Sequence, residues 1–274
     1  MKIRVGISPC PNDTFIFDHL LHDPELTKKF EIDYSLEDVQ TLNQAAIDEK
    51  YDVVKISVGA YPLIHHGYQL LHAGGAMGEG VGPLLVQRAE DELLNIENVE
   101  VAIPGENTTA HALLNAACPK VGKKVFMPYD KIESFVLSGS GLGVIIHENR
   151  FTYAERGMRL RMDLGKCWED QTGSPVPLGA IAIKRSLSHE IQTQIQSEIV
   201  TSINKSWQRY PKLSEFIREN AQEMNEVVMR KHIELYVTQY SNDWGDSGRR
   251  AIRAFLCQMD PSKNWMSESI FIGS

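Results

Sequence analysis

Strand and helix patterns alternate at the start of the chain, and this alternation constrains the fold more than any other feature. Apolar strand patterns at residues 3–7, 30–38 and 51–59 are separated by helix patterns at 14–22 and 41–50. Strands joined in this way can pair in parallel, because the crossover connections between them are right-handed. The sequence therefore predicts an α/β fold that begins with three parallel strands.

A second series of the same kind begins near residue 99. Strand patterns at 99–105, 123–129 and 142–148 enclose helix patterns at 108–118 and 132–139. The order of elements repeats that of the first series, so we expect a second α/β unit of similar design.

The chain is expected to return from the second series to the first unit. A strand pattern at 177–185 leads out, and apolar residues then recur at every fourth position from 187 to 207. This spacing predicts a long amphipathic helix, which Ser186 or Ser188 can cap. The remaining segment, up to about residue 258, is also expected to be rich in helix.

These patterns predict two lobes. The larger lobe is expected to be discontinuous, with residues 1–98 and 186–274, and the smaller inserted lobe to hold residues 99–185. Such lobes can enclose a cleft that closes on a small molecule by hinge motion. Glycine-rich stretches at 74–82 and 139–143 are expected to be turns, the second because it precedes a strand and does not open a helix.

Charge and cysteine content exclude several classes of partner and site. The chain of 274 residues has a formal net charge of −8, whereas polyanion-binding proteins need clustered Lys and Arg. The four cysteines form no CxxC pair, which argues against a zinc site or a disulfide framework. No stretch has the pattern of a signal peptide or a membrane span. We therefore expect a cytoplasmic protein that binds neither nucleic acid nor membrane.

Polar residues follow four of the predicted strands, at the ends where open α/β sheets bind ligands. They fall at residues 8–12, 55–59, 105–109 and 147–149. The third group opens a helix, whose unpaired N–H groups suit a carboxylate or phosphate, although Thr108 there also fits a plain helix cap. The sequence thus predicts a site for a small polar or anionic ligand.

Lys55 is unusual because it lies inside an otherwise apolar strand. A buried ammonium group needs a partner, so Lys55 is either a ligand contact or half of an ion pair. Ser57 and Gly59 follow it, and glycine allows close approach of the backbone to a ligand. These neighbours favour the ligand contact.

His147 follows an apolar strand and should lie at the cleft. Imidazole is the side chain best suited to accept a proton near neutral pH, although most single histidines are structural. His111 fits either a second ligand contact or the core, and a solvated or capping role suffices for His232. Cys10 has no support as a nucleophile.

Four stretches together resemble the 1,4-dihydroxy-6-naphthoate synthase family of the futalosine route to menaquinone. They are SPCPNDTFIF at 8–17, YDVVKIS at 51–57, PGENTTAHALL at 104–114 and LGVIIHENRFTY at 142–153. The resemblance extends over most of the chain. It implies a type 2 periplasmic-binding-protein fold, with an interlobe cleft, used as a cytoplasmic enzyme.

The resemblance also implies roles for individual residues. His147 would be the general base, and substrate contacts would come from the KIS and TT segments, namely Lys55, Ile56, Ser57, Thr108 and Thr109. Ser8 and Asn12 join this set from their position alone. The substrate would be cyclic dehypoxanthine futalosine, an aromatic carboxylate, cleaved in a lyase reaction without a metal or redox cofactor.

Two rival functions stay open at this point. A chorismate dehydratase-like enzyme of the same pathway and fold would act on a smaller dicarboxylate, although the HENRFTY segment favours the synthase. A non-catalytic binding protein could also use two lobes and a hinge. The region around Trp244 and Trp265 fits either the core or a dimer contact, so a homodimer is also open.

Overall fold

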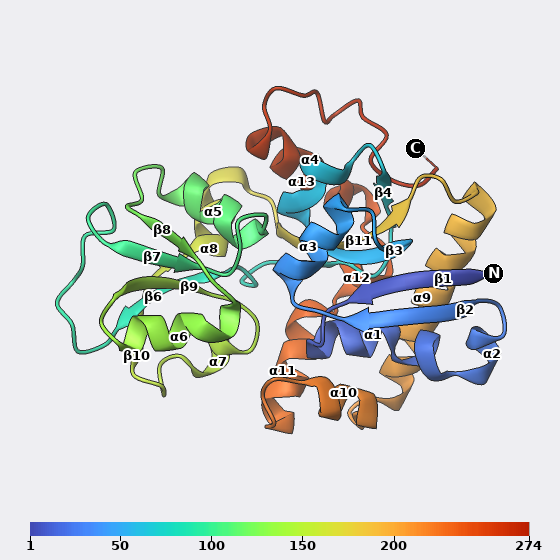
Figure 1. The fold of residues 1–274 in the computed structure, drawn as a ribbon, viewed down its shortest axis with the longest axis horizontal. Helices are drawn as coiled ribbons and strands as arrows, with labels where there is room; N and C mark the ends of the chain where they lie inside the picture. Colours follow the sequence, from blue (N-terminus) through green and yellow to red (C-terminus); the bar gives the residue numbers. More distant parts are fainter. Residues whose placement is uncertain (274) are drawn as a thin grey trace. The chain divides into compact units, whose positions relative to one another are not determined.

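The computed structural model describes residues 1–273 and divides into two compact units (Figure 1). The first holds Met1–Gly78 and Pro177–Ser274, and the second holds Glu79–Val176. The expected boundaries, after residues 98 and 185, differ from these. Strand pairing explains the difference. The strand at 84–88, within the residues expected in the larger lobe, joins the sheet of the second unit, and the strand at 176–184, expected in the smaller lobe, joins the sheet of the first unit.

The sheet of the first unit contains the predicted parallel strands. Its order is β2 (Glu31–Leu36), β1 (Lys2–Ile7), β3 (Val53–Ser57), β11 (Val176–Lys184) and β4 (Tyr68–Leu70), and β5 (Ala76–Gly78) also pairs with β11. β1 pairs in parallel with both β2 and β3, which confirms the first strand–helix series. β11 runs antiparallel to β3 and therefore belongs to this unit.

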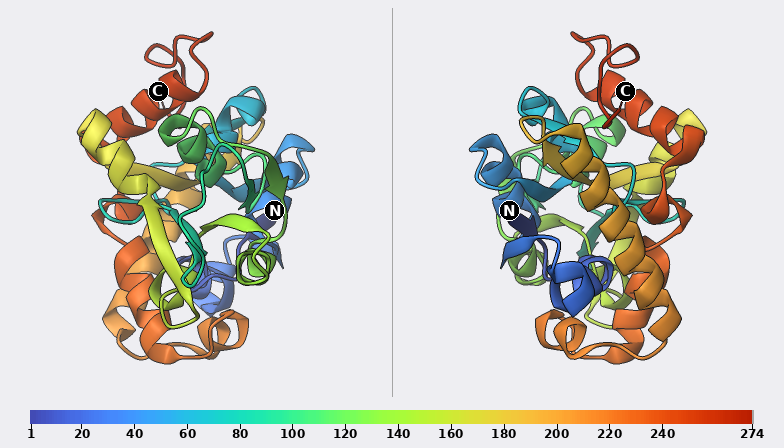
Figure 2. Two further views of the ribbon diagram at one scale, coloured as in Figure 1. Left: turned by 90° about the vertical axis from the view of Figure 1, so that its left-hand side faces the viewer. Right: turned by 90° about the vertical axis from the view of Figure 1, so that its right-hand side faces the viewer.

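Helices complete the first unit. They are α1 (Pro11–His22), α2 (Pro24–Thr27), α3 (Val39–Ile47), a 3-10 turn (Val58–Ala60), α4 (Tyr61–Ile64), α9 (His189–Arg209), α10 (Glu215–Asn220), α11 (Glu226–Tyr236), α12 (Gln239–Asn242) and α13 (Gly245–Met259). The long helix α9 lies beside α1 (Figure 2). Ser188 caps α9 by accepting the N–H of Ile191, so the second of the two predicted caps is used.

The sheet of the second unit repeats this design. Its order is β10 (Met158–Asp163), β6 (Leu84–Arg88), β9 (Gly141–Ile145), β7 (Glu100–Ile103) and β8 (Lys124–Phe126). β7 pairs in parallel with β8 and β9, which confirms the second series. The helices are α5 (Thr109–Ala117), α6 (Tyr129–Leu137), α7 (Asn149–Thr152) and α8 (Leu164–Thr172).

Both glycine-rich stretches contain turn or bend residues, as expected, but each also contains strand, which the prediction did not include. β5 lies within 74–82, where Gly75 packs so closely on the buried indole of Trp244 that a Cβ would lie 1.7 Å from a ring carbon. In the second stretch, β9 begins at Gly141, where a Cβ would lie 2.2 Å from the carbonyl oxygen of Glu100. Glycine at these positions allows close packing instead of a turn.

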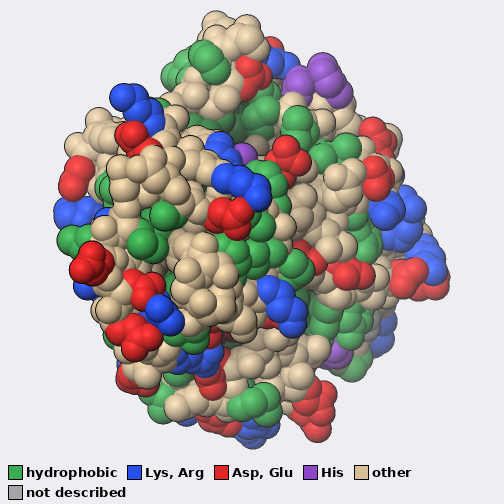
Figure 3. All heavy atoms as spheres, turned by 60° about the vertical axis from the view of Figure 1, so that its left-hand side comes forward, with side chains coloured by type: hydrophobic (Ala, Val, Ile, Leu, Met, Phe, Trp, Pro, Cys, Tyr) green, Lys and Arg blue, Asp and Glu red, His purple; other side chains and the backbone are tan. Residues whose placement is uncertain are grey.

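Charge distribution, helix hydropathy and burial each bear on a question that the sequence raised. Basic and acidic side chains are interspersed over the face drawn in Figure 3. Within residues 1–273, no helix combines the length and apolar character needed to cross a membrane. Trp244 and Trp265 are both fully buried, so they belong to the core of the first unit.

Candidate active site

A cluster of buried polar side chains lies where β1 and β3 end. Asp13 is its centre: its Oδ1 accepts hydrogen bonds from Lys55 Nζ (2.6 Å) and Asn12 Nδ2 (2.8 Å), and its Oδ2 accepts one from Ser8 Oγ (2.7 Å). We call these four residues, together with His232, the Asp13 cluster. Two of the four polar groups expected at strand ends thus meet in one hydrogen-bonded network.

The local sequence explains why Asp13 lies at this edge of the sheet. Pro11 occupies the first position of α1, and the carbonyl of Cys10 accepts the N–H groups of Asp13 and Thr14. Asp13 therefore lies in the first helical turn, where the positive end of the helix dipole stabilises a carboxylate. Cys10 acts here as the residue before the helix, and its side chain makes no capping hydrogen bond.

Lys55 is half of a buried ion pair, which was the second of the two interpretations that its position allowed. The side chains of Lys55 and Asp13 are only 7% and 2% exposed. Gly179 on β11 leaves room for the lysine, because a Cβ there would lie 2.9 Å from Lys55 Cε. Among residues 1–273, the ammonium group of Lys55 donates a hydrogen bond to Asp13. An ammonium group has three N–H groups, so others remain for a ligand.

Ser57 and Asn43 form a reciprocal pair beside the Asp13 cluster. Asn43 Oδ1 accepts the backbone N–H of Ser57 (2.8 Å), and Asn43 Nδ2 donates to Ser57 Oγ (3.1 Å). Both residues are buried. Because Ser57 Oγ accepts from Asn43, its own hydrogen can point to another acceptor. Ile56 lies between Lys55 and Ser57 on β3, so its side chain faces the opposite side of the sheet.

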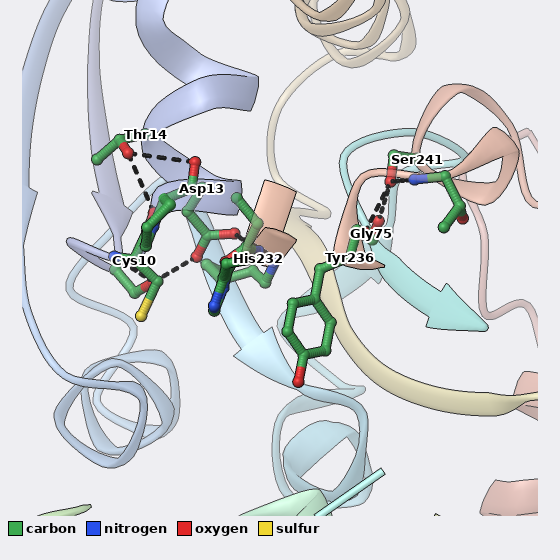
Figure 4. Close-up of polar contacts among 12 residues, drawn as sticks. Cys10, Asp13, Thr14, Gly75, His232, Tyr236 and Ser241 are labelled. Carbon is green, nitrogen blue, oxygen red and sulfur yellow. Dashed lines mark hydrogen bonds and ion pairs between the residues drawn. The ribbon is translucent and has the colours of Figure 1, made fainter. Parts of the chain in front are cut away.

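His232 was expected to be solvated or to cap a helix, and this expectation was wrong. The residue is only 1% exposed, and its Nε2 lies 2.9 Å from Asn12 Oδ1. Its ring contacts that of Tyr236, one turn further along α11, with 4.6 Å between the centroids. Figure 4 shows His232 beside Asp13, with Tyr236 on its other side. α11 thus contributes a histidine to a site otherwise built from β1, α1 and β3.

In the second unit, Thr108 and Thr109 lie at the start of α5. Thr108 caps the helix: its Oγ1 accepts the N–H of His111 (3.2 Å) and donates to the carbonyl of Gly105 (2.8 Å). Thr109 is the first residue of the helix, and both threonines are buried. The hydroxyl of Thr108 is thus engaged in the cap, and the first-turn N–H groups are the donors that a helix start offers to an anion.

His111 is held next to this helix start. Its Nδ1 lies 2.8 Å from the carbonyl oxygen of Glu106, and its ring contacts that of Phe126. Burial lowers the pKa of His111 below its ordinary value of 6.5. The shift favours the neutral imidazole at this helix start.

His147 follows β9 and is partly buried. Its ring contacts that of Tyr129, with 4.9 Å between the centroids. The backbone of His147 has φ +57°, a left-handed conformation that is uncommon for any residue except glycine. Since β7 and β9 are parallel neighbours, the segments that follow them, with Thr108 and His147, lie at the same edge of the sheet.

The structure therefore gathers the predicted residues into two groups, one in each unit. Ser8, Asn12, Lys55 and Ser57 lie together in the first unit, and Thr108, Thr109 and His147 share one sheet edge in the second. Sequence reasoning missed Asp13, Asn43 and His232. Asp13 could have been found from the sequence, because a buried lysine needs an acidic partner and Asp13 directly follows Asn12.

Comparison with known proteins identifies the family. Residues 3–259 match the family model described as "Menaquinone biosynthesis". The protein named 1,4-dihydroxy-6-naphtoate synthase in Thermus thermophilus is 37% identical over 263 residues, which is 94% of each chain. Its namesake in Streptomyces coelicolor is 36% identical over 260 residues, or 93% of this chain and 91% of that protein.

Solved structures show which fold the chain shares. A protein from Archaeoglobus fulgidus matches with a TM-score of 0.87 and 32% identity, over 95% of this chain and 97% of that one. The alkanesulfonate-binding protein of Xanthomonas axonopodis pv. citri matches with a TM-score of 0.72 and 10% identity, over 99% and 96% of the chains. The latter likeness confirms the predicted periplasmic-binding-protein fold. The chain belongs to the 1,4-dihydroxy-6-naphthoate synthase family of menaquinone biosynthesis.

Proposed function

We propose that this protein is a carbon–carbon lyase that converts cyclic dehypoxanthine futalosine to 1,4-dihydroxy-6-naphthoate in the cytoplasm. The observation that carries the proposal is the 37% identity, over 94% of the chain, with the synthase of Thermus thermophilus. Removal of a proton next to a carbonyl group starts the reaction, and cleavage of a carbon–carbon bond then releases a sugar-derived fragment as the second product. Formation of the aromatic ring makes 1,4-dihydroxy-6-naphthoate stable. One base and a well-held substrate suffice for such a step.

His147 is the proposed base. Imidazole can accept a proton near neutral pH, and His147 lies at the carboxyl end of β9, where open α/β sheets bind ligands. Its left-handed backbone also supports the proposal. A left-handed conformation costs on the order of 1 kcal/mol, and residues held in it cluster at active sites, although Glu49 adopts the same conformation after a helix.

The other predicted residues hold the substrate in this proposal. The first turn of α5, with Thr108 and Thr109, binds the aryl carboxylate through N–H groups and the helix dipole. In the first unit, the ammonium of Lys55 and the hydroxyl of Ser57 donate hydrogen bonds to substrate oxygens. Ile56 contributes through its backbone, and Ser8 and Asn12 orient the remainder.

The direct test is an assay of the purified protein with cyclic dehypoxanthine futalosine, followed by the absorbance of the naphthoate product. We expect formation of 1,4-dihydroxy-6-naphthoate with no turnover of chorismate. Turnover of chorismate alone would assign the protein to the dehydratase reaction. Tight binding of the futalosine compound without turnover would assign it to the non-catalytic class.

The carboxylate site has its own test. Thr108→Val removes the cap, and Thr108→Val with Thr109→Val leaves the first-turn N–H groups in place. We expect product affinity to fall by about threefold to tenfold in the double variant, because loss of the Thr108 cap loosens the first turn that carries these N–H groups. Thr201→Val on α9, where the hydroxyl donates to the carbonyl of Ser197, is the matched control. Unchanged affinity in the double variant would count against hydroxyl contacts from Thr108 and Thr109 and against a need for the cap, and it would leave carboxylate binding by the backbone N–H groups open.

A further inference from the structure

We propose that His232 is a positioning residue that fixes the carboxamide of Asn12, so that Asn12 presents an N–H group to the substrate. The hydrogen bond itself is a property of the structure alone. Its consequence for turnover rests on the proposed function, because it requires that Asn12 contact the substrate. His232 lies on α11, and Asn12, which it orients, lies 220 positions earlier in the sequence.

The chain of hydrogen bonds fixes the orientation of each group in turn. Asp13 receives hydrogen bonds from Lys55, Ser8 and Asn12, as a carboxylate does. The group of Asn12 that faces this carboxylate must therefore be the NH₂ group, at 2.8 Å. Its carbonyl oxygen then faces His232, so the imidazole donates from Nε2 at 2.9 Å.

This orientation leaves one N–H of Asn12 for the substrate. The NH₂ group has two hydrogens, and one of them is used by Asp13. Among residues 1–273, no protein acceptor is assigned to the second. Asn12 is therefore a hydrogen-bond donor whose direction is set by two neighbours, and it suits a carbonyl, hydroxyl or carboxylate oxygen of the substrate.

Because the site is buried, the orientation of the Asn12 carboxamide depends on His232. Asn12 is 6% exposed and His232 is 1% exposed, so water does not readily replace the imidazole as a donor. An amide oxygen left without its donor in a buried site is costly, and the carboxamide would then shift or rotate. α11 also packs on α1, which carries Asn12 in its first turn, so the helix pair holds both groups in register.

Kinetics of a double-mutant cycle test whether His232 acts through Asn12. In the wild-type background we expect His232→Leu and Asn12→Ala each to lower kcat/KM by about tenfold. Asn12→Ala should then have little further effect in the His232→Leu protein, because the donor is already misplaced. His232→Gln, which keeps an N–H donor, should recover activity to within about threefold of wild type.

Controls separate positioning from simple packing. Lys231→Leu changes the exposed neighbour of His232 on the same helix and should leave kcat/KM unchanged. Thermal unfolding shows whether each variant is folded at the assay temperature. Multiplicative losses from Asn12→Ala and His232→Leu, or no recovery in a folded His232→Gln protein, would overturn the positioning role.

Nitrogen NMR of the wild-type imidazole tests the hydrogen bond without any assay of activity. In protein labelled with ¹⁵N, and with the signal assigned by its loss in His232→Leu, we expect a protonated Nε2 in His232. An unprotonated Nε2 would overturn the inference. If the wild-type protein has no synthase activity but Nε2 is protonated, the proposed function fails while the orientation of Asn12 stands.

Discussion

Breaking the buried ion pair between Lys55 and Asp13 should strongly destabilise the protein. The two groups lie 2.6 Å apart, and their side chains are 7% and 2% exposed. Lys55→Met has nearly the same length but leaves the carboxylate with the neutral donors Ser8 and Asn12 in place of the ammonium group. Removing one partner of a buried pair costs about 3–5 kcal/mol, so we expect the free energy of unfolding to fall by that amount.

A variant that lacks both charges tests whether Lys55 and Asp13 depend on each other. Asp13→Asn alone leaves the lysine unpaired and should also cost about 3–5 kcal/mol. Lys55→Met with Asp13→Asn removes both charges, so no unpaired charge stays buried. The loss in the free energy of unfolding should therefore be smaller than the sum of the two single losses by at least about 2 kcal/mol. Unfolding in urea, followed by circular dichroism, measures all four proteins.

An exposed pair provides the control. Lys166 and Asp170 lie 3.0 Å apart on α8, but their side chains are 68% and 62% exposed. Lys166→Met should therefore leave the unfolding transition almost unchanged, because solvent screens such pairs. Additive losses in the double variant, or a Lys55→Met protein as stable as wild type, would refute the view that Lys55 and Asp13 depend on each other.

Three further predictions concern packing, pH and hydrogen bonding. Gly75→Ala should cost at least about 3 kcal/mol in urea unfolding, since its Cβ would overlap Trp244; a loss below about 1 kcal/mol would contradict the packing. Burial lowers the pKa of His111, so this histidine binds a proton more readily in the unfolded chain than in the folded protein. The free energy of unfolding therefore falls as the pH drops below about 6.5. His111→Gln should therefore lose less stability than wild type between pH 7.5 and 5.5, and equal losses would contradict this. Asn43→Ala, which leaves the N–H of Ser57 unsatisfied, should cost about 2 kcal/mol and Ser57→Ala about 1 kcal/mol, and the reverse order would be inconsistent with the structure.

The sequence was sufficient to predict the two α/β series, because strand and helix periodicities are local properties. The cap of α9 at Ser188 and the parallel pairing of β1 with β2 and β3 follow from such local patterns. The exchange of β6 and β11 between the units could not be predicted, because it depends on which sheet edge is open after the other strands have paired.

In the candidate site, too, residues marked by a local pattern could be predicted, and residues brought in by distant contacts could not. Residues directly after strands, such as Ser8 and His147, could be chosen because the carboxyl ends of parallel strands meet at one edge. His232 lies on a helix of mixed polarity, and nothing in its local sequence indicates that α11 packs on α1. Contacts between distant segments of this kind require the tertiary structure.

A single-turnover measurement tests whether His147 removes a proton from the substrate. Wild-type and His147→Asn proteins, each in excess over cyclic dehypoxanthine futalosine, are compared for the rate of naphthoate formation and for product affinity. If His147 is the base, we expect a rate at least about 100-fold lower in His147→Asn, with product still bound and the fold intact. A folded His147→Asn protein that forms naphthoate at the wild-type rate would contradict it.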